Sequence, residues 1–426
     1  MTNGTTGDCM TTLGPVAAAD RHLELDLLRG LGVLGILAVN AAAFALPFEL
    51  QLSPELSPHP WTGANATAWW VMATFFEFKF ITLFSLLFGV SIFLVGGERS
   101  DLARGALLRR RLFWLAVFGL IHGLAIWYGD ILLLYAWSGL FMLLMRSWSA
   151  RKLFWIGLTV VVLGSLISVG QLVALEFAPA EIQREALESM AGGYDAADVA
   201  AATEAMRGDL MTGLRENAGN WVMLAVMSLL FLVFRTVGLM MIGLALYRWG
   251  FLTGRAPAWL YGLLIVATAG SLYLVGLSNT AQLAIDFAQP QSGGRYGAAN
   301  ELLSLVITLG YASAAILLIR AAPARRLLAP VAAVGRMAFT NYLTQSLIMT
   351  TIFYGGRGLG LFGSMDHAQL WLVVFAVWAL QLVWSPLWLS RFRMGPLEWV
   401  WRRLTYGKGL ARAGGDQPPP MASETR

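Results

Sequence analysis

The chain has 426 residues, of which 57% are hydrophobic and only 13% are charged, well below the roughly 25% of charged residues expected in a soluble domain. A soluble fold is therefore excluded, and apolar runs of roughly 17 to 25 residues predict spanning helices, not barrel strands. The net charge of +5 does not indicate nucleic acid binding, because the basic residues gather where the apolar runs end.

Ten apolar segments are predicted to cross the bilayer as helices of one all-α polytopic bundle. The tail before them, residues 1–26, lacks the pattern of a cleavable signal peptide. Its Cys9 is the chain's only cysteine, so neither a disulfide nor a thiolate metal site is expected. The N-terminal spans lie within 27–175 and the C-terminal spans within 221–390. The ten segments are 27–46, 68–96, 112–128, 131–145, 153–175, 221–247, 257–277, 301–319, 337–354 and 369–389.

Three segments outside these spans have distinct compositions. Residues 176–220 are rich in Ala, Glu and Asp and are predicted to form two amphipathic helical pieces outside the membrane. In 391–406, Pro396 can begin a short helix whose Trp399 and Trp401 suit headgroup depth, which predicts an interfacial helix. Residues 407–426 are rich in Gly, Pro and Ser and are predicted to be disordered.

The distribution of basic residues predicts the orientation of the bundle. If both termini are cytoplasmic, most of the 30 Lys and Arg residues lie on the inner side, as the positive-inside rule requires. The outer loops then contain only Arg184, Arg207, Arg215, Arg295 and Arg357.

Lys79 and Arg235 fall inside predicted spans, where a charge is costly and usually faces a bundle interior or a wet cavity. Lys79, Thr82, Ser85 and Gly89 share one helix face, which suits either neighbouring helices or a ligand. A structural role, with the charge snorkelling or paired with an acid, remains open for both basic residues.

The most distinctive segment is GLIHGLAIWYGDILLLY, which contains His122 and Asp130. Gly129 is expected to end one helix, and Asp130 to begin the next, where an acid is favoured by the helix dipole. A neutral imidazole bonded to a neighbouring helix would also explain His122. Because a carboxylate-oriented imidazole can take and return a proton near neutral pH, the pair is a candidate for general base catalysis.

Asn341 and Gln345 lie on one face of the predicted span 337–354. Such amides commonly join helices to one another, and contact with a substrate is the alternative. The sequence has no HExxH, GxSxG or phosphate-loop motif, so no metal site is predicted.

Five ordered motifs between residues 24 and 406 resemble the YeiB family, also called domain of unknown function 418. The resemblance implies a multi-pass protein of the bacterial cytoplasmic membrane, in a family whose reaction is not established. The motifs are LDLLRGLGVLGILAVN, KFITLFSLLFG, GLIHGLAIWYGDILLLY, GRMAFTNYLTQSLI and GPLEWVWRRLT.

The fold is also similar to the wider group of transmembrane acyltransferases. In acyltransferase-three proteins an Arg precedes a His by eleven positions. Here Arg29 matches the Arg and Asn40 occupies the place of the His. That resemblance makes Arg29 and Asn40 candidate contacts for a substrate. Because Asn40 cannot act as a base, another histidine is required, and His122 is the first choice. His59 in HPWTG is the second, because this stretch looks like a His-Ala-Pro-Trp segment of heparan-alpha-glucosaminide N-acetyltransferase.

Three hypotheses follow for function. The first is an acyltransferase that uses a cytoplasmic thioester such as acyl-coenzyme A and an outer sugar, lipid or cell-wall acceptor, with Lys79 or Arg235 stabilising the oxyanion. The inner arginines would suit such a donor, although topology and anionic lipid also explain them. The second is a transporter or channel for a small solute, and the third is a membrane scaffold without catalysis.

Overall fold

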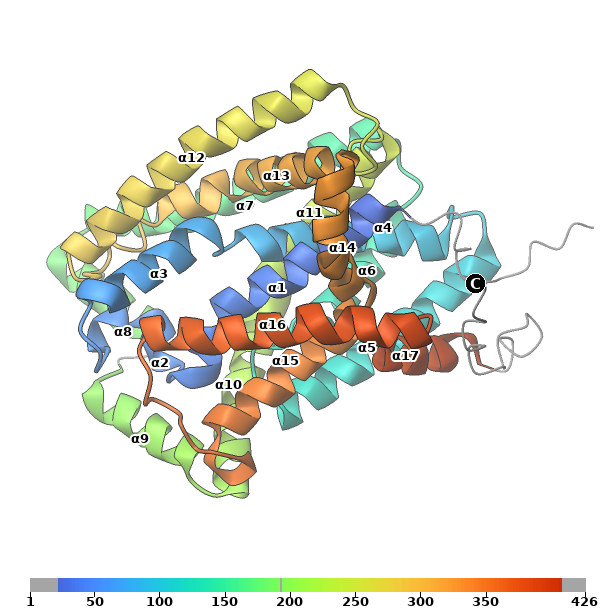
Figure 1. Ribbon diagram of the computed structural model, residues 1–426. Coiled ribbons are helices and arrows are strands. Elements are labelled where there is room, and N and C mark those ends of the chain that lie inside the picture. The colour runs from blue at the N-terminus through green and yellow to red at the C-terminus, as the bar shows by residue number, and fades with distance from the viewer. Residues whose placement is uncertain (1–21, 192–193, 408–426) are drawn as a thin grey trace, which may run out of the picture.

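The computed structural model describes residues 22–191 and 194–407. Cys9, most of the N-terminal tail, the glycine pair 192–193 and nearly all of the tail predicted to be disordered lie outside the described residues. The described chain folds as an all-helical bundle, which confirms the predicted fold class (Figure 1). Its helices are α1 (Leu23–Ala45), α2 (Glu49–Leu52), η2 (Pro54–Leu56), α3 (Gly63–Phe75), α4 (Lys79–Gly96), α5 (Leu102–Ala125), α6 (Leu132–Met145), α7 (Ala150–Glu176), α8 (Ala180–Ala191), α9 (Ala196–Arg207), α10 (Leu210–Met227), η3 (Ser228–Leu232), α11 (Val233–Arg248), α12 (Ala258–Ala284), α13 (Ala298–Arg320), α14 (Ala322–Arg336), α15 (Ala338–Phe353), η4 (Gly355–Arg357), α16 (His367–Arg391) and α17 (Pro396–Tyr406).

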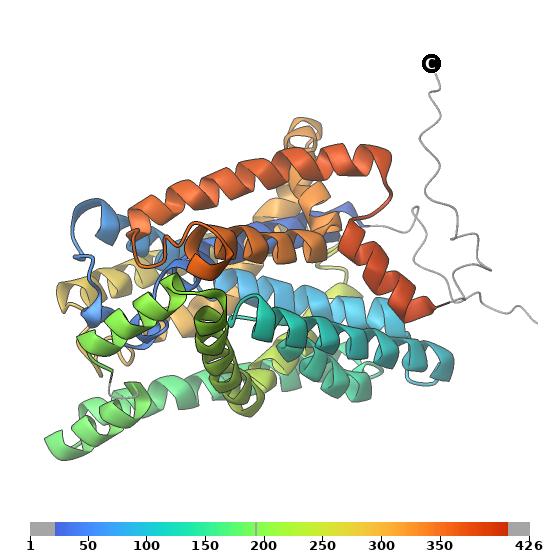
Figure 2. The same ribbon diagram turned by 90° about the horizontal axis from the view of Figure 1, so that it is seen from below.

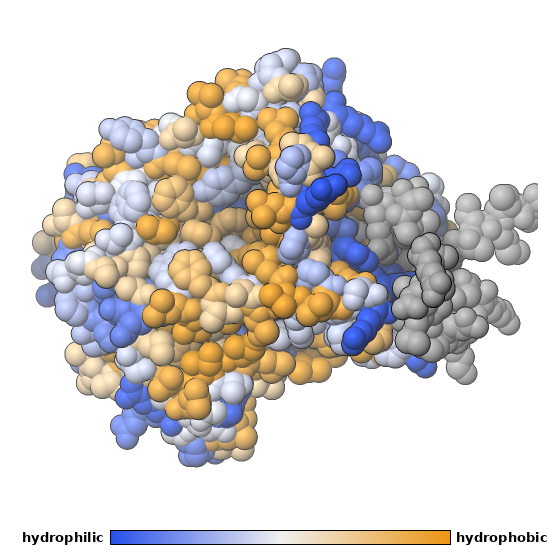
Figure 3. Space-filling view, in the orientation of Figure 1, coloured by the Kyte–Doolittle hydropathy of each residue, from blue (hydrophilic) through white to orange (hydrophobic). Residues whose placement is uncertain are grey.

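The protein is a multi-pass membrane protein. Seven helical stretches of the described chain are long and apolar enough to cross a bilayer, and α6 is a shorter apolar helix. The predicted spans 112–128, 131–145 and 337–354 fall on α5, α6 and α15. Large apolar side chains remain exposed on the outer helices, among them Ile167, Val266 and Leu372. Figure 3 shows apolar residues over the middle of one face and hydrophilic ones mainly toward its ends, as expected of a surface that faces lipid.

Two long spans are interrupted. In the predicted span 68–96 the helix breaks between α3 and α4, where Phe78 adopts the left-handed conformation with a φ of 62°. Between α10 and α11, Ser228–Leu232 form a π-helical turn. Such breaks are common beside functional or tightly packed regions of membrane helices.

Helix α14 lies between the predicted spans 301–319 and 337–354, and the sequence did not indicate it. It is amphipathic, with exposed Arg325 and Arg326 and a buried face that includes Ala332 and Val334. It crosses the direction of its neighbours in Figure 1 and packs against α1. Its short apolar stripe is too narrow for a span, which is why hydropathy alone does not reveal it.

Helices α1, α4 and α11 form the centre of the bundle. Gly89 of α4 lies against the backbone of Met240, and Gly243 of α11 lies against the backbone of Leu86, so a side chain at either glycine would collide with the facing helix. This close approach is typical of membrane helices that pack through small residues. It confirms that part of the Lys79 face serves neighbouring helices.

Both termini of the described chain lie at one end of the bundle, with α17 (Figures 1 and 2). We call it the basic end, because Arg29, Arg111, Arg393 and Arg402 gather there in the first turns of α1, the first half of α5 and the segment from α16 to α17. Helices α8 and α9 lie at the opposite end, and they correspond to the two helical pieces predicted within 176–220.

Candidate functional site

A cavity of about 590 Å³ opens at the basic end between α1, α4, α5, α6, α15 and α17. This volume is in the range of sites that hold small molecules. The wall extends along α5 from Asp101 to Leu115, which corresponds to a depth of about 20 Å at the rise of an α-helix. The cavity therefore reaches from the protein surface well into the bundle.

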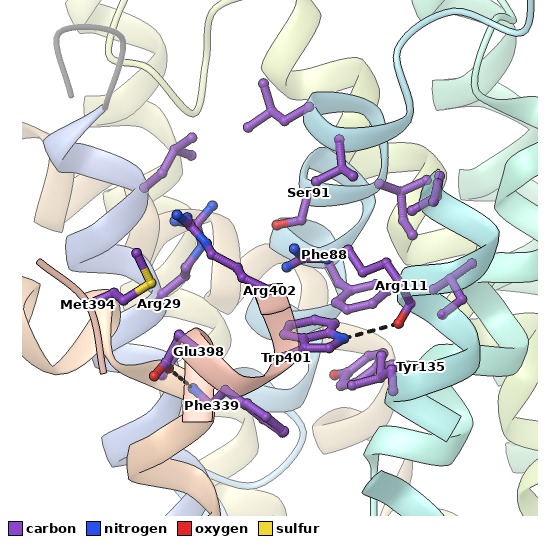
Figure 4. Close-up of a pocket in the computed structure, with 18 of the residues that line it drawn as sticks. Arg29, Phe88, Ser91, Arg111, Tyr135, Phe339, Met394, Glu398, Trp401 and Arg402 are labelled. Carbon is purple, nitrogen blue, oxygen red and sulfur yellow. Dashed lines mark hydrogen bonds between the residues drawn. The ribbon is translucent and has the colours of Figure 1, made fainter. Parts of the chain in front are cut away.

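The cavity is basic near its mouth and apolar farther in. Figure 4 shows the side chains of Arg29, Arg111 and Arg402 converging on it from α1, α5 and α17. The guanidinium group of Arg111 lies 3.8 Å from the ring centroid of Trp401, an arrangement that fixes its orientation. The deeper wall consists of large apolar and aromatic side chains, namely Phe84, Phe88, Leu112, Leu115, Ile131, Tyr135, Phe339 and Tyr342.

Glu398 of α17 is the acid in the cavity wall that fixes the start of α15. Its Oε1 accepts hydrogen bonds from the amides of Phe339 (2.8 Å) and Thr340 (3.0 Å), and its Oε2 accepts one from the Thr340 hydroxyl (2.5 Å). The carboxylate thus satisfies backbone donors that the helix itself leaves unpaired. Burial raises the pKa of Glu398 above its usual 4.5, although these hydrogen bonds act in the opposite direction.

Because the folded protein raises the pKa of Glu398, the protonated form is favoured in the native state, and the wild-type free energy of unfolding should fall as pH rises from about 4.5 through the raised value. Glu398→Gln keeps an oxygen acceptor and removes this titration. We expect the melting temperature of the variant, relative to wild type, to increase from pH 4 to pH 7. Thermal unfolding in detergent measures it, with exposed Glu55→Gln as control. A difference that does not change with pH would contradict the expectation.

Tyr342 closes the inner end of the cavity, and behind it lies the predicted pair of His122 and Asp130. The ring centroids of Tyr342 and His122 are 5.3 Å apart. His122 Nδ1 lies 2.8 Å from Asp130 Oδ1, so the structure brings together the two side chains that the sequence predicted to interact.

A third residue completes this group. His122 Nε2 lies 2.8 Å from the Oγ of Ser346, which belongs to α15. The side chains of His122 and Asp130 are 1% and 0% exposed, and Ser346 is fully buried. Asp130, His122 and Ser346 therefore form a buried chain of hydrogen bonds that connects α6, α5 and α15.

The hydrogen-bond partners of Asp130 determine the direction of this chain. Its Oδ1 accepts from the amide of Leu132 (3.1 Å) and its Oδ2 from the amide of Leu133 (2.9 Å), at the start of α6. A carboxylate held by two amides acts as an acceptor, so Nδ1 of His122 carries its proton and donates to Asp130. The Nε2 atom is then the acceptor, and the Ser346 hydroxyl donates to it.

The local sequence explains why this arrangement forms between α5 and α6. Gly119 lies one turn before His122, and a Cβ there would come within 2.6 Å of the Leu133 nitrogen and 2.9 Å of Asp130 Oδ2. Only a glycine lets the start of α6 approach α5 so closely. On the other side, Asn217 of α10 donates to the carbonyl of Gly123 (2.8 Å) and covers the end of α5.

His59, the other candidate base, lies at the end of the bundle opposite the cavity. It precedes α3, and its ring nitrogen Nε2 is buried without a hydrogen-bond partner. Asn65 links it to His367, since its Nδ2 donates to the His59 carbonyl (3.5 Å) and its Oδ1 accepts from the His367 amide (2.9 Å). Nearby, the rings of Trp61 and His367 lie 5.0 Å apart, and His59 is not part of the cavity wall.

The two basic residues predicted inside spans are engaged in contacts between helices. The fully buried Lys79 donates to the carbonyl of Ala73 (3.0 Å) and to Oδ1 of Asn300. Arg235 donates to Ser165 (3.0 Å), Ser304 (2.9 Å) and Glu301 (3.1 Å). Neither residue lines the cavity, and both sets of contacts favour the structural interpretation.

The amides of α15 join helices as well. Asn341 Nδ2 donates to the Val334 carbonyl and to Ser385, each at 3.1 Å, and Gln345 Nε2 donates to Gln381 (2.9 Å) and to the Val33 carbonyl (3.2 Å). Asn40 is partly exposed on α1 and does not line the cavity.

Arg29 does line the cavity and pairs with Asp26 at 2.8 Å. Sequence reasoning missed Ser346, Tyr342 and Glu398. The spacing of four between Tyr342, Ser346 and Thr350 was a signal for the first two, because it places them on one helix face.

Comparisons with known proteins agree with the resemblance of the motifs. The chain is 34% identical over 409 residues to "Uncharacterized protein YeiB" of Escherichia coli (strain K12), which covers 91% of this chain and 96% of that protein. It is 32% identical over 416 residues to "Uncharacterized protein YxaH" of Bacillus subtilis (strain 168), with coverages of 93% and 97%. Residues 246–408 match the family "Protein of unknown function (DUF418)". No solved structure matches the chain.

Proposed function

Because the chain belongs to the YeiB family of DUF418 proteins, for which no reaction is established, we propose a function from the site itself. The protein transfers an acyl group from a thioester donor, bound in the cavity at the basic end, to a hydroxyl or amine of a sugar, lipid or cell-wall precursor. The single observation that supports this proposal is the position of Tyr342, which separates the cavity from the Asp130–His122–Ser346 chain.

The cavity has the chemistry that an acyl thioester requires. Guanidinium groups near the mouth suit the phosphates of coenzyme A, since arginine forms paired, charge-assisted hydrogen bonds with phosphate oxygens. The apolar inner wall suits an acyl chain. The basic end is cytoplasmic by the positive-inside rule, so we place the protein in the bacterial cytoplasmic membrane with the donor entering from the cytoplasm.

His122 acts as the general base in this reaction, and Asp130 holds the imidazole in the tautomer whose Nε2 can accept a proton. Lys79 and Arg235, the oxyanion partners suggested by the sequence, are held by other side chains. Tyr342 replaces them in the proposal, because its phenol borders both the cavity and the imidazole. Its hydrogen bond to the Gly129 carbonyl, at 3.5 Å, is weak enough to be exchanged.

The experiment uses the purified chain in vesicles of phosphatidylethanolamine and phosphatidylglycerol, whose headgroups present an amine and hydroxyls. Acetyl-, octanoyl- and palmitoyl-coenzyme A are added in turn, and free thiol and acylated lipid are measured. Thiol release above that of protein-free vesicles, with at least one donor, is the expected result. Absence of release with all three donors would contradict the proposal.

Arg29→Ala should weaken donor binding more than it slows the chemical step. Loss of one arginine contact to a phosphate, partly screened by solvent, is worth about 1–2 kcal/mol, so we expect KM for acyl-coenzyme A to rise about 5- to 30-fold. The steady-state rate of thiol release measures this effect. Arg326→Ala, on the exposed face of α14 and outside the cavity, is the control and should leave KM unchanged.

A cavity that opens at one end and is closed at the other also suits a transporter in one of its two access states. Under this second proposal a small anionic solute would cross the membrane without chemical change. Counterflow of a labelled solute without thiol release would favour transport over transfer.

A further inference from the structure

We propose that Ser346 is a nucleophile that carries the acyl group as an ester between donor and acceptor, an inference that rests on the proposed function. The sequence alone predicted no nucleophile in this part of the chain. The geometry behind it is the buried chain in which Asp130 Oδ1, His122 Nδ1, His122 Nε2 and Ser346 Oγ follow one another at 2.8 Å.

The position of Ser346 determines which proton His122 can take. Its Nε2 is occupied by the Ser346 hydroxyl at 2.8 Å, so the proton closest to this base belongs to the serine and not to an incoming acceptor. The same order of carboxylate, imidazole and hydroxyl activates serine nucleophiles on unrelated folds. The competing partner of the hydroxyl, the Tyr342 carbonyl, is 3.4 Å away and geometrically poorer.

Access from the cavity to Ser346 depends on Tyr342. Ser346 is 0% exposed, and Tyr342 lies one helical turn before it on the same face of α15, between the serine and the cavity. Rotation of the weakly held Tyr342 side chain would connect the two. Burial in the resting state excludes water, which would otherwise hydrolyse an ester intermediate.

An ester intermediate would also suit a reaction that crosses the membrane. A soluble thioester and an acceptor on the other side cannot meet at one surface. An ester at Ser346 removes this difficulty, because the thiol leaves through the basic end before the acceptor arrives. The two half-reactions then share one base and one serine but need not share one open pathway.

The reaction balances as two acyl transfers. Ser346 Oγ attacks the thioester carbonyl while its proton passes to His122 Nε2; a C–O bond forms, the C–S bond breaks, and the proton leaves with the thiolate as free thiol. The acceptor hydroxyl or amine then attacks the ester carbonyl, its proton passes to Nε2, and the bond to Oγ breaks as that proton returns to Ser346. The net reaction exchanges a thioester for an ester or amide.

The experiment traps the ester on the full chain in lipid nanodiscs. The protein is incubated with isotope-labelled acetyl- or octanoyl-coenzyme A without added acceptor, quenched in acid and digested with trypsin, which cuts after Arg336 and Arg357. We expect a burst of up to one thiol per chain and one acyl group on Ser346 in the peptide 337–357. Ser346→Ala should carry none, and His122→Ala should acylate about 10²- to 10⁴-fold more slowly.

Two further variants separate chemistry from folding. Ser346→Cys keeps a nucleophile at the same position and should yield a hydroxylamine-sensitive thioester even if turnover is lost. Thr344→Ala removes a hydroxyl that bonds only within α15 and should be acylated as wild type is. Label on Ser346→Ala, or thiol release and acceptor acylation by wild type without any adduct on Ser346, would overturn this inference and leave the proposed function standing. Absence of thiol release from wild type with every donor would overturn both.

Discussion

His122→Ala is expected to lower the rate of thiol release from acyl-coenzyme A by about 10²- to 10⁴-fold, the usual contribution of a positioned general base. The imidazole links Asp130 to Ser346, and no other side chain is hydrogen-bonded to both in the described chain. Alanine therefore leaves the serine hydroxyl without a base. The measurement is steady-state thiol release in proteoliposomes at saturating donor.

Three other variants make this result specific. Asp130→Asn should also slow release strongly, because an amide can stabilise the wrong imidazole tautomer. His367→Ala changes a histidine outside the cavity wall, and His59→Ala changes the second candidate base. Both should retain activity within a few fold. An inactive His59→Ala protein beside an active His122→Ala protein would move the chemistry to the opposite end of the bundle.

Thermal stability distinguishes a catalytic His122 from a purely structural one. The imidazole bridges two helices, so its loss will lower the melting temperature in either case. If the site binds the donor, octanoyl-coenzyme A should raise the melting temperature of wild type and of His122→Ala alike. The reason is that Tyr342 lines the cavity and His122 does not. A scaffold would lose stability without responding to the donor.

The sequence could predict the parts of the fold and site that depend on local spacing. Apolar runs identify the helices on which the ten predicted segments lie, seven of which fall on stretches long and apolar enough to cross a bilayer, and Pro396 begins α17 as expected. His122 and Asp130 are eight residues apart across a short turn, so the hairpin of α5 and α6 brings them together with little help from the rest of the chain. The short spacing and the two ionisable side chains were therefore sufficient to predict the contact between His122 and Asp130.

The remaining site contacts connect residues that are far apart in sequence. Ser346 is 224 residues from His122, and Asn300 is 221 residues from Lys79. Arg235 is 66 residues from its partner Glu301. A single sequence gives the composition of each helix face but not which faces meet, because many apolar pairings have similar energies in a membrane. The structure is therefore needed to identify the partner of each buried polar group.

Lys79→Met tests this distinction directly and should destabilise the protein without abolishing its chemistry. The change leaves the Asn300 amide oxygen without its donor in a buried site and leaves the Ala73 carbonyl with the Asn300 side-chain amide as its remaining side-chain donor, at a cost on the order of 3 kcal/mol. We expect a clearly lower melting temperature in detergent. The folded fraction should release thiol at a rate within a few fold of wild type, because Lys79 does not line the cavity.

The matched control is Lys152→Met, whose ammonium group lies over the ring of Trp148 at the start of α7. Because Lys152 is exposed, its loss should change the melting temperature little. The decisive comparison is between stability and rate in the same preparation. A Lys79→Met protein that melts like wild type but releases no thiol would assign the ammonium group to the oxyanion, and α4 would then have to move toward Tyr342 during the reaction. A Lys79→Met protein that melts at a lower temperature but retains activity would assign Lys79, with Asn300, to the contacts that hold α3, α4 and α13 together.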